Sequence, residues 1–146
     1  MPFDPDQRRS GCPISCSLDL LGDKWSLLIV RDMVFVGKRY FKEFLGSNEA
    51  IATNVLADRL QRLEATGIIT KRPDPKSGRQ VIYTLTEKGK ALIPLLVELV
   101  CWGALHDAAR DANPTKVRRI MQDKQRFIRK LEEGCAVEPV SGPRKA

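Results

Sequence analysis

Residues 40–86 read YFKEFLGSNEAIATNVLADRLQRLEATGIITKRPDPKSGRQVIYTLT, and this stretch decides the fold. Its first helical pattern covers 40–45 and is interrupted by the poor helix formers of 46–49. A second pattern runs from Ala52 to Thr66 and ends at Gly67, with an apolar stripe formed by Leu56, Leu60 and Leu63. Two helices joined by a turn are typical of a helix-turn-helix.

The rest of this stretch predicts a β-hairpin. The runs 68–72 and 80–85 are rich in β-branched residues, and the loop 73–79 between them contains two prolines and a glycine. A hairpin directly after the second helix is the arrangement of a wing. The sequence therefore predicts a winged helix-turn-helix, a mainly α fold with a small β-hairpin wing (α+β).

The polar face of the second helix is a candidate for reading DNA bases. It carries mostly short side chains that would not hold the backbone away from the groove, and Arg59 and Arg62 flank it. The base-facing candidates are Thr53, Asn54, Ala57 and Gln61. Any surface helix has a polar side, so this face alone fits solvent as well as it fits DNA.

Cations around the two helices and the wing suggest contacts with phosphates or with the minor groove. We assign these contacts to Lys42, Arg62, Lys76 and Arg79, with Arg79 entering the minor groove. A charged hairpin loop can also serve only solubility. Residues 37–90, however, hold eleven Lys or Arg against six Asp or Glu, so this segment supplies five of the net charge of +7. The excess lies where DNA would dock, and double-stranded DNA is the expected partner.

Several motifs resemble the HxlR-type family of bacterial transcription regulators. They are Cys12-Pro13-Ile14, the run from Leu18 to Ile29 with its Gly-Asp-Lys-Trp core, the run from Leu60 to Glu64, and the run from Tyr83 to Gly89. They occur in order over residues 12–105. The resemblance implies a homodimeric, MarR-related winged-helix repressor or activator on a pseudo-palindromic operator, often responsive to an oxidant or electrophile.

Two departures from the family pattern lie in the DNA-reading region. Ala52 stands where members commonly carry a capping Ser, which leaves amide donors at the helix start without a side-chain acceptor unless Thr53 or Asn54 caps a later start. The wing reads Pro-Lys-Ser-Gly-Arg at 75–79 and looks more like the wider MarR group. The operator sequence therefore cannot be carried over.

The flanking segments predict dimerisation helices. Thr86 caps the apolar stretch 91–105, in which Pro94 predicts a kink or an irregular start, and Asn113-Pro114 starts a last helix. Both helices are more apolar than one small core requires, although packing back on the chain's own domain is the alternative. The expected interface residues are Leu96, Leu99, Val100, Trp102, Val117, Ile120, Met121, Phe127, Ile128 and Leu131.

These patterns divide the chain into a flexible arm (1–11), the winged-helix domain (12–112), a C-terminal dimerisation helix (113–135) and a disordered tail (136–146). The arm has no apolar core of a signal peptide, and the stretch 91–105 is shorter than the roughly 20 residues that cross a bilayer. We therefore expect a cytoplasmic protein without a membrane span.

Cys12 is the candidate redox-sensing residue among Cys12, Cys16, Cys101 and Cys135. It precedes a helix, and Arg8 and Arg9 nearby would favour its thiolate; the alternative is a buried, inert thiol. Trp25 is expected in the core, and Trp102 in the interface or lining an effector pocket.

A thiol-based redox enzyme is the competing function, together with a protein-interaction module that binds no DNA. The Cys12–Cys16 spacing lacks the Cys-x-x-Cys pattern of redox enzymes, and the single histidine, His106, lies far from both. We expect no enzymatic activity, no cofactor and no metal site.

Overall fold

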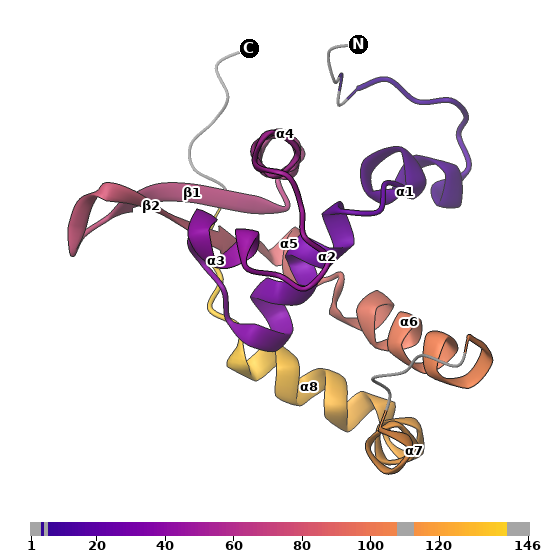
Figure 1. Ribbon diagram of the computed structural model, residues 1–146. Helices are drawn as coiled ribbons and strands as arrows, with labels where there is room; N and C mark the ends of the chain where they lie inside the picture. The colour runs from indigo at the N-terminus through magenta and orange to yellow at the C-terminus, as the bar shows by residue number, and fades with distance from the viewer. Residues whose placement is uncertain (1–3, 5, 108–112, 140–146) are drawn as a thin grey trace.

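The stretch that decides the fold forms two helices and a hairpin in the computed structural model, which describes residues 4, 6–107 and 113–139. Helix α3 (Phe41–Leu45) leads through a turn into α4 (Thr53–Ala65), and strands β1 (Ile69–Asp74) and β2 (Ser77–Leu85) follow as an antiparallel pair. Figure 1 shows the hairpin projecting sideways and α4 on the outer side of the molecule. The expected winged helix-turn-helix, mainly α with a two-stranded wing, is confirmed.

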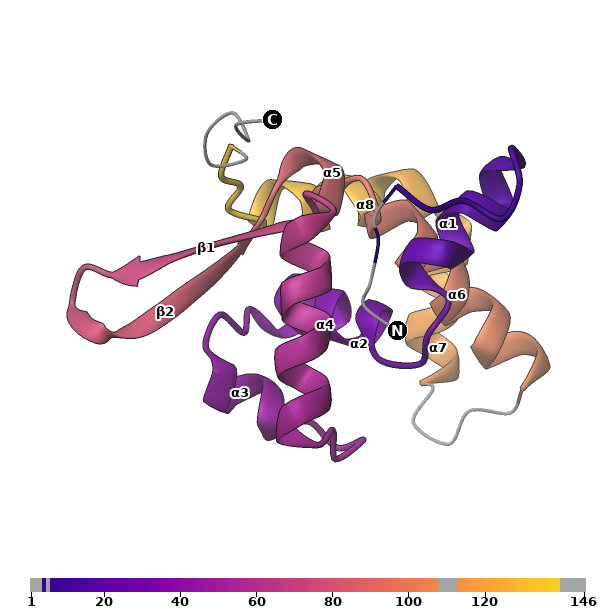
Figure 2. The same ribbon diagram turned by 90° about the horizontal axis from the view of Figure 1, so that it is seen from above.

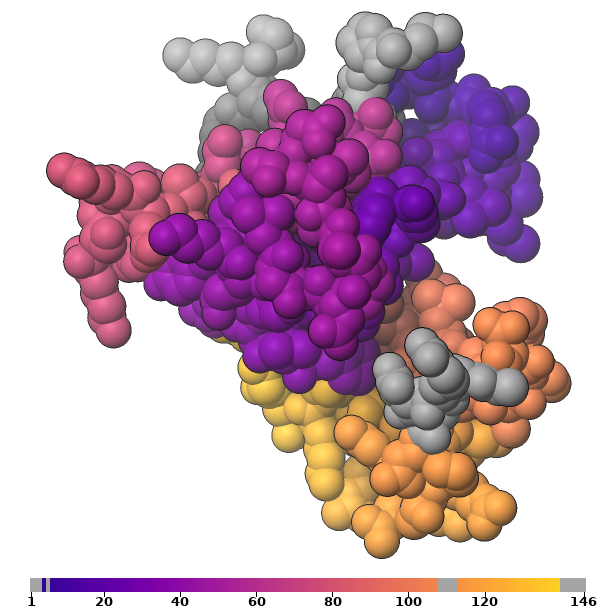
Figure 3. All heavy atoms as spheres, viewed as in Figure 1, coloured from indigo at the N-terminus to yellow at the C-terminus, as the bar shows by residue number. Residues whose placement is uncertain are grey.

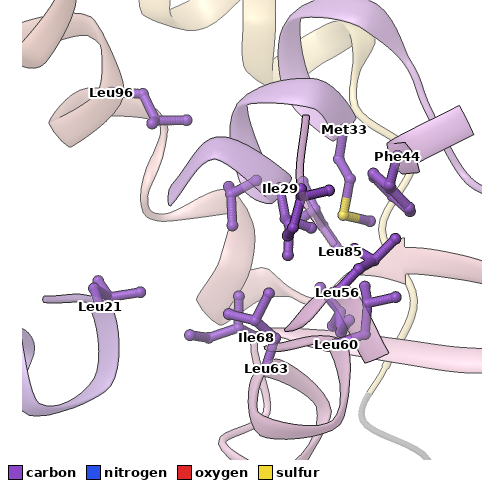
Figure 4. Packing of buried hydrophobic residues seen from close by; sticks show 13 residues of the cluster. Leu21, Ile29, Met33, Phe44, Leu56, Leu60, Leu63, Ile68, Leu85 and Leu96 are labelled. Atoms are coloured by element: carbon purple, nitrogen blue, oxygen red, sulfur yellow. The ribbon is translucent and has the colours of Figure 1, made fainter. Parts of the chain in front are cut away.

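The core lies beneath α4, because its apolar stripe is buried as the spacing predicted. Leu56, Leu60 and Leu63 are at most 2% exposed, and they pack with Phe44 of α3 and Ile29 of α2 (Ser26–Arg31) (Figure 4). Leucine-sized side chains contribute about 1.5–3 kcal/mol each when fully buried. This packing holds α4 in place and leaves its other face outward.

The C-terminal end of α4 is tied to the base of the wing. Gly67 has φ +77°, a left-handed conformation that ends the helix, and the Ile68 amide donates to the carbonyl of Leu63 at 2.9 Å. Thr86 caps the short helix α5 (Glu87–Lys90) and not the apolar helix that the sequence predicted, which starts later, after Leu92. The Thr86 hydroxyl also donates to the Ile68 carbonyl at 3.2 Å. A Cβ at Gly89 would lie 2.2 Å from that carbonyl oxygen, so only glycine allows the start of α5 to lie this close to the Ile68 backbone.

The wing differs from the prediction in the length of its loop. The sequence predicted a seven-residue loop at 73–79, but the strands extend to Asp74 and from Ser77, leaving only 75–76 between them. Asp74 pairs with Ser77 and Pro73 with Val81, so Gly78, Arg79 and Gln80 have no partner in β1 and form an irregularity in β2. Only Lys76 of the two wing cations lies at the tip; Arg79 lies in the strand.

The N-terminal part begins with α1 (Pro13–Leu21), followed by α2, which continues into the π-helical segment η1 (Asp32–Val36). Trp25 precedes α2 and packs against the core, as predicted, with the Lys24 ammonium 5.1 Å from its ring centroid. We call α2 to β2 the head. Helix α1 lies beside the head, on the side opposite the wing (Figure 1).

The C-terminal half differs from the predicted single helix at 113–135. Helix α6 (Ile93–His106) is followed by two helices, α7 (Pro114–Gln122) and α8 (Lys124–Gly134), which both pack against it. Asp123 separates them, since its carboxylate caps α8 by accepting the Arg126 amide at 3.0 Å. Asn113 caps α7, as predicted, and Pro94 lies in the first turn of α6, where it starts the helix without kinking it. We call α6, α7 and α8 the C-terminal lobe.

This packing corrects part of the predicted dimer interface. Ile120 and Ile128 are buried with Ile93, Val97 and Cys101 in a second cluster, and Phe127 and Leu131 pack against it. Val117 is also buried, and Leu96 belongs to the core of the head. These residues find their partners within the chain because α7 and α8 fold back on α6, the alternative that the sequence left open. Leu99, Val100, Trp102 and Met121 remain exposed.

The predicted disordered tail is wrong for its first residues. Val137 forms a parallel bridge with Leu85, and the Glu138 amide donates to the Leu85 carbonyl at 3.0 Å. The Glu138 carboxylate pairs with Arg72 of β1 at 2.8 Å. Residues 135–139 therefore join α8 to the base of the wing, and we call them the strap. The remainder of the predicted tail, and residues 1–3 and 5 of the predicted arm, lie outside the described residues.

The helical stretch Glu87–His106 is 20 residues long and apolar enough to cross a membrane by length and composition. The sequence analysis counted the apolar stretch from residue 91, whereas the helical stretch in the structure begins at Glu87, so the predicted length was too short. In the fold the stretch is interrupted between α5 and α6, and Ile93 and Val97 are fully buried against other parts of the chain. One side of α6 is therefore packed like a core helix, whereas Leu95, Leu99 and Trp102 on the same helix are exposed.

Candidate nucleic-acid interface

The outward face of α4 gathers the predicted base-reading residues. Thr53, Asn54, Ala57 and Gln61 are all exposed, on the side opposite the buried leucines. Figure 2, seen from above, shows α4 lengthwise on the near side of the molecule with no other described helix or strand over it, and Figure 3 shows its magenta atoms at the surface. The structure thus brings these four residues to one accessible helical face, as the periodicity predicted.

The first turn of α4 lacks a side-chain cap. Ala52 is the N-cap residue in extended conformation, and its side chain makes no capping hydrogen bond. Neither Thr53 nor Asn54 caps a later start, since Thr53 is already the first helical residue. The helix start therefore presents amide donors and the positive end of its dipole to solvent.

Arg59 is an anchor of α4 and does not flank the outward face, contrary to the prediction. Its guanidinium donates to Asp23 at 2.9 Å, and the Asp23 carboxylate also accepts from the Ser26 hydroxyl at 2.5 Å and from the Trp25 and Ser26 amides. Burial opposes ionisation of Asp23, but the hydrogen bonds from Ser26, Arg59 and the amides together lower its pKa. This pair fixes α4 relative to the start of α2.

Arg62, a predicted phosphate contact, forms an ion pair within α4. Its guanidinium lies 2.9 Å from the Asp58 carboxylate one turn earlier, and Asp58 also contacts Arg59. Part of the Arg62 charge is therefore neutralised locally. This makes Arg62 a weaker candidate for phosphate contact than the cations of the wing.

A buried carboxylate sets the turn between α3 and α4. Asp32 is 4% exposed and contacts Arg31 at 2.9 Å, Lys38 at 3.3 Å and the Ser47 hydroxyl. Arg31 also pairs with Glu49 at 2.5 Å, and this hydrogen bond is the main cause that raises the Arg31 pKa. The sequence analysis missed this cluster, because no local pattern joins Asp32 to Ser47, which lies 15 positions later.

Tyr40 connects α3 to the wing. Its hydroxyl donates to Asp74 at 2.9 Å, and Asp74 accepts the Lys76 amide at 2.9 Å, which shapes the wing tip. The Lys76 amide is the main cause that lowers the Asp74 pKa. The sequence analysis named neither Tyr40 nor Asp74 as functional, and no local pattern joins residues 34 positions apart.

Lys42 and Arg79 line one groove between α3 and β2. The groove encloses about 340 Å³, and Tyr40, Phe41, Gln80, Val81 and Tyr83 complete its walls. Both cations are exposed. Three of the four predicted phosphate or minor-groove residues therefore lie on α3 and the wing, while Arg62 lies on α4 beside Asp58.

Cys12 is exposed and occupies the N-cap position of α1. Hydrogen bonds from the Ser15 and Ile14 amides lower its pKa, which favours the thiolate. The sequence predicted that nearby arginines would favour the thiolate, but Arg9 pairs with Asp19 at 2.5 Å. The backbone amides lower the Cys12 pKa in its place. The alternative of a buried thiol at Cys12 is wrong; Cys101 is the buried cysteine.

Helices α6 and α1 each carry exposed apolar side chains. Leu99, Val100 and Trp102 were predicted there; the structure adds residues the sequence analysis missed, namely Ile14, Leu18, Leu95 and Leu105. Trp102 is 62% exposed and its ring lies 5.8 Å from that of His106, so it is not enclosed in a pocket of the single chain. Within the described ranges, no three His, Cys, Asp or Glu side chains cluster to hold a metal ion.

Comparison with known proteins places this geometry in a family. The family described as HxlR-like helix-turn-helix matches residues 20–111. The HTH-type transcriptional regulator YodB of Bacillus subtilis is 37% identical over 92 residues, which cover 62% of this chain and 81% of YodB.

Solved structures agree. The crystal structure of PA1607 has a TM-score of 0.64 at 43% identity and covers 72% of both chains. The redox regulator HypR in its reduced form has a TM-score of 0.57 at 30% identity, covering 68% of this chain and 95% of HypR. Reduced YodB has a TM-score of 0.55 at 34% identity, covering 66% of this chain and 95% of YodB, and YodB has also been solved with quinone bound.

The helices α7 and α8 follow the segment that the family description matches, which ends at residue 111. The matched segment contains α2 to α6 whole, and with them the outward face of α4 and the wing. The relatives with assigned roles are transcriptional regulators and not enzymes. The chain belongs to the HxlR-like helix-turn-helix family of transcriptional regulators.

Proposed function

We propose that this regulator binds double-stranded DNA as a homodimer, with α4 in the major groove and the wing over the adjacent minor groove. The observation that carries the proposal is the outward face of α4, where Thr53, Asn54, Ala57 and Gln61 are exposed together on a helix anchored from behind. Short polar side chains on a fixed helix suit direct reading of base edges. The uncapped helix start adds amide donors for a phosphate oxygen.

The cations of α3 and the wing complete this proposed interface. Lys76 at the wing tip and Arg79 in β2 extend the surface beyond α4, and Lys42 lies across the groove from Arg79. Contacts of this kind release counterions and fix the register of the protein on the duplex. Arg62 can contact a phosphate only if its guanidinium leaves Asp58, so we assign it the smallest contribution to DNA affinity among the four cations.

Dimerisation is supported by the exposed apolar side chains of α6 and α1. Large apolar side chains there, among them Leu18, Leu99 and Trp102, are left exposed by the parts of the chain that the structure describes. A two-fold arrangement would place two copies of α4 in successive major grooves about 34 Å apart. Whether the bound dimer represses or activates depends on where its operator lies relative to a promoter. A protein acting on chromosomal DNA works in the cytoplasm.

A mobility shift on the upstream intergenic DNA of the protein's own gene, at two salt concentrations, tests DNA binding. Lys76→Ala should weaken binding to all sequences and lower the slope of log affinity against log salt by about 0.9. The matched control is Lys124→Ala, because Lys124 pairs with Glu98 in the C-terminal lobe, away from α4. An unchanged slope for Lys76→Ala would reject the wing contact, and no binding by the wild type to any duplex would reject the proposal.

Thiol sensing at Cys12 is the second proposal, supported by the exposed N-cap position and the lowered pKa. The relative YodB has been solved with quinone bound. A Cys12 thiolate would add to an electrophilic quinone carbon, forming a thioether with the reduced ring. Because Ile14 and Leu18 on the same helix belong to the proposed dimer face, an adduct there would change the separation of the two α4 helices.

The test of sensing is the same mobility shift with a quinone or with diamide, together with mass spectrometry of the treated protein. We expect Cys12→Ser to abolish both the adduct and the change in DNA affinity, while Cys16→Ser, the neighbouring cysteine on α1, responds like the wild type. If Cys12→Ser responds like the wild type, sensing lies elsewhere, and the proposal of DNA binding is unaffected.

A further inference from the structure

The C-terminal lobe carries a concentration of positive charge that the proposed DNA interface does not use. Between residues 113 and 130 there are seven Lys or Arg and one acidic residue, Asp123. Figures 1 and 2 show α7 and α8 on the side of the molecule opposite α4. A duplex read by α4 would therefore not reach this surface.

Four of these cations line one groove between α7 and α8. The groove encloses about 530 Å³, a volume within the range of small-molecule sites. Its cationic rim consists of Lys116, Arg119, Arg126 and Lys130, and Ile120 and Phe127 supply apolar surface between them. In the described parts of the chain, none of the four cations forms an ion pair within 4.0 Å.

The carboxylate in the groove does not neutralise this charge. Asp123 caps α8 through the Arg126 amide and lies between the two helices. Four cations and this one carboxylate line the same groove, so the groove keeps a net positive charge beside apolar side chains. Guanidinium groups bind carboxylates and phosphates in a bidentate manner, and an apolar surface between them favours a ligand with an aromatic or aliphatic body.

We propose that this groove binds a small organic anion that carries at least two acidic groups on an apolar body. Charge complementarity selects the acidic groups, and Ile120 and Phe127 select the body. The floor of the groove is rigid, because Ile120 packs with Ile93 and Val97 of α6. The site is a property of α7 and α8, which follow the matched family segment, and it does not depend on DNA binding by α4.

Isothermal titration calorimetry of the full chain with naphthalene-1,5-disulfonate tests the proposal directly. This probe has two fixed negative groups on an aromatic body, and sodium sulfate supplies the charge without the body. We expect one saturable site per chain for the probe, with much weaker binding of sulfate. Arg119→Gln combined with Arg126→Gln should reduce probe affinity at least about tenfold, the loss expected from removing charge-assisted hydrogen bonds.

Arg118→Gln combined with Arg129→Gln is the matched control, because both arginines are exposed on α7 and α8 but lie outside the groove. It removes the same charge, so retention of probe affinity within about twofold would support a defined site. Equal losses of probe affinity in the two double variants, or equal affinity for sulfate and for the probe, would overturn the proposal of a defined site. An equal loss of affinity for a random DNA duplex in the groove variant would assign the groove to nucleic acid and also overturn it.

Discussion

The carboxylates that position α4 in the head have ion-pair partners, whereas, among the described residues, the cations of the groove in the C-terminal lobe do not. In the head, Asp32 contacts Arg31 and Lys38, and Asp23, just before α2, contacts Arg59 of the head. These buried or half-buried carboxylates are therefore paired. In the lobe, the four cations of the groove form no ion pair among the described residues, and a face of α6 exposes leucines and a tryptophan. The head uses polar contacts to fix α4, whereas the lobe leaves polar and apolar surface available to other molecules.

The largest expected contrast concerns leucines. Leu56 is fully buried in the head and Leu99 is 46% exposed on α6. Leu56→Ala should lower the free energy of unfolding by about 2–5 kcal/mol, since it removes buried surface and leaves a cavity. Leu99→Ala should cost less than about 1 kcal/mol in dilute protein.

Urea unfolding at two protein concentrations checks this contrast. If α6 pairs with a second copy, the cost of Leu99→Ala increases with concentration, because dimerisation adds to stability by mass action. Equal costs for the two leucines in dilute protein would show that the exposed face of α6 is covered within the chain, contrary to the structure.

The anchor of α4 predicts a dependence of stability on pH. The hydrogen bonds that lower the Asp23 pKa stabilise the folded state above the ordinary aspartate value of 3.8, and this stability is lost as pH falls from there through the folded pKa. Asp23→Asn should destabilise the protein by about 1–3 kcal/mol at pH 7, because Arg59 loses a charged partner.

The difference in unfolding free energy between wild type and Asp23→Asn should therefore narrow as pH falls below about 4. Circular dichroism during urea unfolding at pH 7, 5 and 3.5 measures it. Asp58→Asn is the control, since Asp58 is 44% exposed at its side chain and its loss should matter less. A difference that stays constant over this pH range would mean that Asp23 is not held ionised by these contacts.

Local patterns predicted the head well and the long-range contacts poorly. The spacing of Leu56, Leu60 and Leu63 predicted which face of α4 is buried, because helical periodicity alone decides it. Arg59 lies beside that stripe, and only the fold brings Asp23, 36 positions earlier, to its guanidinium. The sequence therefore assigned Arg59 to the wrong face.

The lobe was predicted less well, for two physical reasons. Asp123 divides the predicted helix in two by capping the start of α8. In a sequence, an aspartate is a weaker sign of a helix boundary than a glycine or a proline. The apolar stripes of α7 and α8 predicted a partner helix, but periodicity does not say whether that helix belongs to the same chain. In the structure it is α6, which Ile120 and Ile128 cover from one side.

The smallest expected effect concerns the strap that connects the two regions. Glu138 pairs with Arg72, whose side chain is 51% exposed, so screening by water limits this ion pair to about 0.2–1 kcal/mol. Glu138→Gln should lower the free energy of unfolding by no more than that, measured by urea unfolding at low salt, and the difference should shrink at 1 M salt. The hydrogen bond from the Glu138 amide to Leu85 does not depend on the side chain and keeps the strap in place. A loss of several kcal/mol in the free energy of unfolding would contradict this. It would show that the ion pair, and not the backbone bridge, holds the lobe against the base of the wing.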